Sequence, residues 1–184
     1  LGLPVLPNQV LVHVNTFHSR KDLGTILDSA ARLGIKHLLV VTGDGGERLP
    51  KLTPMSLGTA GNSVTSVELL AFIEKEYPGK FICGVAFNPY EPQDHEREKM
   101  QRKLNAGARF IITQPVIARH PAVDSLREFN VPVLVSAWMS KRLDLLSQCV
   151  GYSLLTTFEY DPFENFRELT KHYNDFGLYF ALLG

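Results

Sequence analysis

Short apolar segments recur along the chain at regular intervals, and most of them are apolar at consecutive positions rather than alternating ones. Each has the length of a β-strand, and strands that are apolar on both faces are typical of a buried parallel sheet. The predicted strands are Val10–Val14, Leu38–Thr42, Phe81–Phe87, Phe110–Gln114, Val131–Ala137, Ser153–Phe158 and Leu178–Leu182.

Segments with helical spacing of apolar residues lie between these strands. The expected helices are Ser19–Leu33, Val64–Tyr77, Gln93–Ala106, Pro121–Phe129, Lys141–Gln148 and Pro162–Phe176. Alternating strands and helices joined by short loops indicate an α/β fold with right-handed crossovers. Because no linker or change in composition interrupts the pattern, we expect one domain over residues 1–184. A doubly wound sheet and a (β/α)8 barrel both fit, although a barrel typically needs about 250 residues.

The composition narrows the class of function. Hydrophobic residues make up 45% and charged residues 21%, as in an ordinary globular protein. The formal net charge is zero, which argues against a nucleic-acid binder. The two cysteines lie in apolar segments and are interpreted as buried thiols in a reducing compartment. No apolar run reaches the ~20 residues of a membrane span, and no secretory signal opens the chain, so we expect a cytoplasmic protein.

Ligands of α/β proteins bind where parallel strands end, so the residues after each strand are the candidates. Thr42-Gly43-Asp44-Gly45-Gly46 places a carboxylate in a Gly-rich loop, which either orients a ligand or forms a tight turn; the motif alone favours the turn. Gln114 ends an apolar strand and needs a hydrogen-bond partner. A ligand and a neighbouring backbone group are equally good partners for it.

Other polar residues carry weaker signals. The charges of Glu96–Lys103 are typical of a solvated helix face with intrahelical ion pairs. His13 and His18 lack the spacing of a metal site, and no motif of a covalent nucleophile is present. Trp138 and Tyr160 follow strands and fit a ligand-stacking role, but aromatic residues there more often belong to the core.

Four segments together resemble the methylenetetrahydrofolate reductase family. The run Lys103-Leu-Asn-Ala-Gly-Ala-Arg-Phe-Ile-Ile-Thr-Gln114 is the most specific of them. The others, in the family's order and spacing, are Leu33–Asp44, Asn62–Leu70 and Gly84–Pro89. The resemblance is good from about Val10 to Ala137. It implies a (β/α)8 barrel that holds FAD at the strand ends and reduces methylenetetrahydrofolate to methyltetrahydrofolate, with NAD(P)H as co-substrate.

The resemblance also implies roles for individual residues. Asp44 matches the aspartate beside the flavin and the folate, where a carboxylate stabilises a cationic iminium intermediate. Gln114 matches the glutamine that holds the folate pterin. These two residues are the predicted catalytic and substrate-binding pair. The predicted FAD-binding residues are His13, Thr42, Gly43, Asp44, Ala86, Phe87, Asn88, Arg102, Lys103 and Ile112, with the two cations suited to the pyrophosphate.

The chain departs from the family pattern in two places. The family's first strand carries a Glu-Phe-Phe-Pro-Pro motif with the general acid, and the resemblance here starts at the third strand. We therefore expect an N-terminally incomplete barrel of six to seven strands, which favours a homo-oligomer or a partner protein. Pro115 stands where the family has an aromatic residue. Besides the reductase, two alternatives stay open: a non-catalytic relative that binds folate or flavin or acts in a complex, and a pocket reassigned to another small molecule.

Overall fold

The computed structural model describes residues 5–43, 45, 48–154 and 159–182. The chain forms two compact units, one of Leu1–Val85 with Arg102–Arg109 and one of Ala86–Gln101 with Phe110–Gly184. Strand β3 (Ile82–Phe87) starts in the first unit and ends in the second, whereas helix α4 (Gln93–Asn105) starts in the second and ends in the first.

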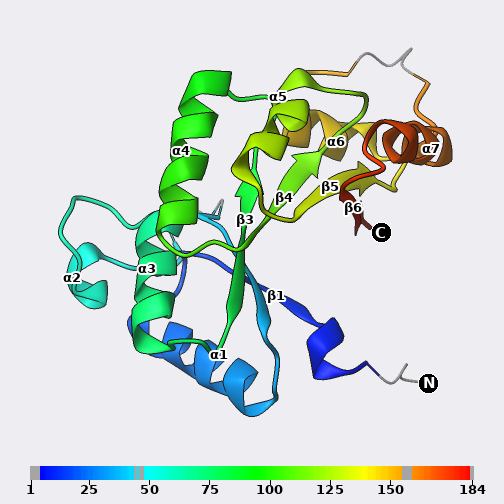
Figure 1. Cartoon of the computed structure of the whole chain (residues 1–184). Helices are drawn as coiled ribbons and strands as arrows, with labels where there is room; N and C mark the ends of the chain where they lie inside the picture. The colour runs from blue at the N-terminus through cyan, green and yellow to red at the C-terminus, as the bar shows by residue number, and fades with distance from the viewer. Residues whose placement is uncertain (1–4, 44, 46–47, 155–158, 183–184) are drawn as a thin grey trace. The chain divides into compact units, whose positions relative to one another are not determined.

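The first unit is built on parallel strands. β1 (Leu11–Val14) pairs with β2 (His37–Val40), which pairs with the start of β3 (Figure 1). The side chains of paired residues on neighbouring parallel strands point to the same face of the sheet, and successive residues along a strand point to opposite faces. One face carries the fully buried Val14, Val40 and Val85 side by side. The other face carries His13, Leu39 and Gly84 in one row.

The helices of the first unit begin at capping residues that the sequence supplies. Helix α1 (Arg20–Arg32) is capped by the Ser19 hydroxyl, which accepts a hydrogen bond from the Asp22 backbone N–H at 3.1 Å. Helix α3 (Ser66–Glu76) starts with a capping box between Thr65 and Glu68. A short helix, α2 (Pro54–Leu57), precedes α3, and a 3₁₀ turn, η1 (Pro7–Gln9), precedes β1.

The second unit repeats the pattern. Strands β4 (Phe110–Pro115), β5 (Val133–Trp138) and β6 (Gly177–Ala181) pair in parallel in that order. Its helical elements are α5 (Pro121–Asp124), η2 (Ser125–Phe129), α6 (Leu143–Val150) and α7 (Pro162–His172) (Figure 1). One core cluster of this unit joins Trp138 at the end of β5 to Leu146 and Val150 of α6.

Six parallel strands separated by helices are the arrangement of an incomplete (β/α) barrel, as the sequence predicted. Most strands lie within two residues of their predicted bounds. The predicted strand Ser153–Phe158 falls mainly on residues 155–158, which lie outside the described residues. Helix α7 ends at His172 rather than Phe176, because Tyr173 leaves the helix to bury its ring.

The cysteine prediction is confirmed for Cys83, which is buried, while Cys149 is half-buried; both are free thiols. Burial raises the pKa of Cys83 to about 12, so this thiol stays protonated near neutral pH. Within the described residues, no helix has the length and apolar character needed to cross a membrane.

Candidate functional site

In the first unit, hydrogen bonds fix the ends of β1 and β2 against each other. The backbone N–H and the hydroxyl of Thr16 both donate to the Thr42 carbonyl, at 3.2 and 2.8 Å. Thr16 is fully buried. The Thr42 hydroxyl in turn accepts a hydrogen bond from the Ser66 N–H at 3.3 Å, in the first turn of α3. The start of the Gly-rich loop is therefore held from two sides.

The glycines on either side of Asp44 leave no space for side chains. Gly43 has φ +84°, and a Cβ there would lie 2.9 Å from the Asn15 Cβ. A Cβ on Gly45 would lie 2.2 Å from the Phe17 ring. Asn15 and Phe17 thus pack directly on the backbone that flanks Asp44, which itself lies outside the described residues. Glycine at these positions allows the two side chains to approach the loop backbone closely.

His13 lies on β1 in the row of Leu39 and Gly84. Burial lowers the pKa of His13 below its ordinary value, which favours the neutral imidazole near pH 7. A neutral ring has one donor and one acceptor, so it suits hydrogen bonding or stacking with a heterocycle.

In the second unit, the register of β4 against β5 shifts between Ile112 and Pro115. The Ser136 N–H donates to the Thr113 hydroxyl at 2.9 Å, a side-chain acceptor in place of a backbone one. Gln114 stands at this irregularity and is half-buried, and Ile112 lies two residues before it on β4. Such irregularities often redirect a side chain near a functional site. Among the described residues, no hydrogen-bond partner engages the Gln114 amide.

The turn after β3 is fixed by a buried carboxylate. Glu96 of α4 is 1% exposed and accepts a hydrogen bond from the Asn88 N–H at 3.2 Å, while Lys99 donates to its other oxygen at 2.9 Å. The Asn88 side chain accepts from the Tyr90 N–H at 3.1 Å, and the Tyr90 hydroxyl donates to the Pro115 carbonyl at 2.9 Å. The ends of β3 and β4 are thereby connected.

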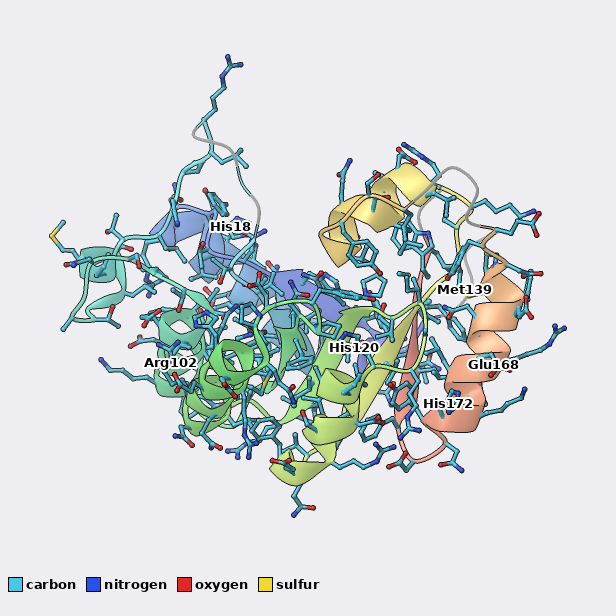
Figure 2. The ribbon with its side chains drawn as sticks, turned by 90° about the horizontal axis from the view of Figure 1, so that it is seen from above. His18, Arg102, His120, Met139, Glu168 and His172 are labelled. Carbon is cyan, nitrogen blue, oxygen red and sulfur yellow. The ribbon has the colours of Figure 1, made fainter. Side chains whose placement is uncertain are left out.

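The remaining predicted cofactor residues differ in exposure. Ala86 is half-buried and Phe87 is buried at the end of β3. Arg102 lies exposed in the last turn of α4 (Figure 2), whereas Lys103 is buried and engaged with another group. An exposed guanidinium is available to an anion, while Lys103 would have to exchange its present partner for one.

The predicted residues therefore form two groups. The first unit contains His13, Thr42 and Gly43 at the strand ends, together with Arg102 and Lys103 of α4. The second contains Ala86, Phe87, Asn88, Ile112 and Gln114. Outside α4, the residues that follow a strand are Thr42, Gly43 and Asn88, whereas those that lie within or at the end of a strand are His13, Ala86, Phe87, Ile112 and Gln114. The described residues contain no group of three or more potential ligands that could hold a metal ion.

The sequence assigned no role to three residues that shape these groups: Thr16, Phe17 and Glu96. Thr16 and Phe17 lie in the segment just after β1. A polar residue followed by an aromatic residue after an apolar run was the sequence feature that could have indicated their role. Glu96 was expected on a solvated face; its intrahelical pair with Lys99 is confirmed, but the solvated position is wrong. The Asn88 N–H, eight residues upstream, holds Glu96 in the interior. Trp138, 1% exposed, belongs to the core.

Comparisons with known proteins identify the family of the chain. The sequence model of the family described as methylenetetrahydrofolate reductase matches residues 9–130. A search of curated proteins gave no significant match.

Solved structures with a similar fold are distant in sequence. The 7,8-dihydropteroate synthase from Vibrio fischeri ES114 has a TM-score of 0.53 at 12% identity, over 95% of this chain and 61% of that one. An uncharacterized protein from Clostridium thermocellum that binds two copies of 5-methyl-5,6,7,8-tetrahydrofolic acid has a TM-score of 0.49 at 14% identity, over 92% and 86%. At these identities, the likeness to the synthase concerns the fold alone, and the chain spans under two thirds of that enzyme.

Proposed function

The chain belongs to the methylenetetrahydrofolate reductase family, and from this premise we propose that it acts as a flavin-dependent oxidoreductase on a one-carbon folate. The proposed reaction reduces 5,10-methylenetetrahydrofolate to 5-methyltetrahydrofolate with NAD(P)H. FAD is the proposed cofactor, and the folate is the proposed substrate.

The observation that carries this proposal is the Gln114 side chain. It is a half-buried amide at the irregular end of β4, it lies within the matched segment, and it has no partner among the described residues. A primary amide offers two donor hydrogens and an acceptor oxygen on adjacent atoms. The edge of a pterin presents complementary acceptors and donors, so a folate would satisfy this amide.

The residues of the first unit fit a flavin. Asn15 and Phe17 hold the loop backbone at Gly43 and Gly45, so at these two positions the loop would offer backbone groups to the flavin rather than side chains. The neutral His13 ring suits a polar heterocycle, and the exposed Arg102 suits a phosphate. When bound there, FAD would supply hydride transfer between NAD(P)H and the folate.

The chain's own contribution is orientation and charge. We propose that Gln114 orients the folate through its amide and that Asp44 provides a negative charge where positive charge develops on the substrate. Thr16 and Phe17 are proposed as positioning residues, because they hold the backbone on both sides of Asp44.

The proposal is tested by separating the two half-reactions of the purified, flavin-loaded protein. We expect Gln114→Ala to slow reoxidation of the reduced flavin by methylenetetrahydrofolate at least about tenfold, the loss expected for a hydrogen bond in a water-excluded site. Flavin reduction by NAD(P)H should change less than about twofold, because that step does not use the pterin contact.

Gln148→Ala is the matched control, since Gln148 is an exposed glutamine of α6 in the same unit. It should leave both half-reactions unchanged. Equal loss of both half-reactions in Gln114→Ala, or loss of bound flavin, would show that Gln114 supports the fold rather than the folate and would contradict its assigned role.

A further inference from the structure

Tyr90, in the segment after β3, is hydrogen-bonded to the end of β4. Its hydroxyl donates to the Pro115 carbonyl at 2.9 Å. Pro115 is the last residue of β4 and directly follows Gln114. All three residues belong to the second unit. The Tyr90 hydroxyl therefore acts on the backbone beside the amide that is proposed to hold the folate.

The pairing of β4 with β5 does not by itself fix the orientation of Gln114. Between paired positions of the two strands, β4 has two residues, Thr113 and Gln114, where β5 has one, Val135. An extra residue of this kind forms a β-bulge, which interrupts the regular ladder and redirects the strand. The conformation at Gln114 is therefore set by contacts other than regular strand pairing.

The backbone that follows Gln114 is held from two sides. On the β5 side, the Val116 N–H donates to the Ser136 carbonyl at 2.9 Å. Tyr90 makes the contact from the segment after β3. Because a proline has no N–H, its carbonyl is the one backbone group through which a hydrogen bond can hold Pro115. The Tyr90 hydroxyl occupies that acceptor.

Tyr90 is itself fixed in place. Its backbone N–H donates to the Asn88 side chain at 3.1 Å, and the Asn88 N–H donates to the buried Glu96 carboxylate at 3.2 Å. Its ring packs edge-on with the rings of His120, labelled in Figure 2, and Tyr152, at centroid distances of 5.4 and 6.0 Å. Burial raises the pKa of Tyr90, so the hydroxyl keeps its hydrogen and can donate it at neutral pH.

We propose that Tyr90 is a positioning residue for Gln114: its hydrogen bond to Pro115 holds the bulge so that the Gln114 amide faces a folate pterin in one orientation. This inference rests on the proposed folate-reducing function and adds a residue to it. The competing explanation is that the hydrogen bond serves only the stability of the fold. A purely stabilising residue would affect both half-reactions alike, whereas a positioning residue affects the folate step, and only while Gln114 is present.

Tyr90→Phe tests the proposal, because it removes the hydroxyl and keeps the ring. In the flavin-loaded protein, reoxidation of the reduced flavin by methylenetetrahydrofolate should slow about three- to tenfold, the range for one hydrogen bond, while flavin reduction by NAD(P)H changes less than about twofold. In the Gln114→Ala background, Tyr90→Phe should slow reoxidation less than about twofold, because the amide that it positions is gone. Additive losses in this double-mutant cycle would overturn the proposal.

Tyr173→Phe is the matched control. Tyr173 is a buried tyrosine of the same unit, and its hydroxyl accepts a hydrogen bond from the His120 N–H at 2.8 Å, further along the segment after β4. This variant should lower the urea midpoint of unfolding, as Tyr90→Phe does, but should change reoxidation less than about twofold. Equal slowing in both variants would show that loosening this segment is enough and would contradict the role of Tyr90.

The side-chain amide resonances of Gln114 give a readout that does not depend on the reaction. In the ¹⁵N-labelled protein without folate, Tyr90→Phe should shift these resonances, and Tyr173→Phe should leave them in place. Unmoved Gln114 resonances in Tyr90→Phe would overturn the inference. If the unchanged protein reduces no folate, the proposed function fails, and these resonances alone decide whether Tyr90 orients Gln114.

Discussion

At the scale of the residue, sequence and geometry agree at Gly43, the first glycine of the Gly-rich loop. The motif alone favoured a tight turn, and Gly43 does adopt φ +84°. What the motif could not reveal is that Asn15, from the previous strand end, fills the space next to Gly43. The same limit explains Glu96, whose burial depends on the Asn88 N–H rather than on the charge pattern of its own helix.

Two substitutions separate the effect of the positive φ at Gly43 from the effect of its contact with Asn15. Gly58→Ala should cost about 1 kcal/mol of unfolding free energy, because Gly58 has φ +65° but open space around it. Gly43→Ala should cost about 1–3 kcal/mol more, because its new Cβ would also meet Asn15 at 2.9 Å. Urea unfolding measures both values. Equal costs would mean that Asn15 gives way freely and does not hold the loop.

At the scale of the element, the predicted helices and strands were located well because their signals are local. The Ser19 and Asp161 side chains cap α1 and α7 close to where the expected helices begin. The end of α7 was placed too late because its decisive contact is tertiary: the Tyr173 hydroxyl accepts from the His120 N–H at 2.8 Å. The register shift beside Gln114 could not be predicted from the sequence either, because the pairing of β4 with β5 determines it.

The capping box of α3 gives a prediction about pH. Although burial alone would raise it, the pKa of Glu68 is lowered by hydrogen bonds from the Thr65 hydroxyl and N–H and by the Arg102 charge. A carboxylate with a lowered folded-state pKa stabilises the fold above its unfolded pKa of about 4.3, and this stabilisation is lost as the pH falls through the folded pKa.

Glu68→Gln should therefore lower the unfolding free energy near pH 7 and lose this effect progressively below about pH 4. Urea unfolding at several pH values measures the difference. Glu76→Gln, at the exposed end of the same helix, is the control and should show little dependence on pH. A constant difference between Glu68→Gln and the unchanged protein at all pH values would contradict the role of the ionised cap.

At the scale of the whole molecule, the succession of parallel strands was predictable because apolar runs of strand length persist through both units. The family followed from motifs carried by the ends of these strands. A cavity beside α7 was not predictable, because its lining combines residues 117–119 with residues 159–172, which are distant in the sequence.

The most direct test of the proposed function is an anaerobic absorbance spectrum of the purified protein supplied with FAD. We expect a flavin spectrum that bleaches on addition of NADH or NADPH and returns on addition of 5,10-methylenetetrahydrofolate. A protein that retains no flavin, or a bound flavin that neither pyridine nucleotide reduces, would contradict the proposed oxidoreductase.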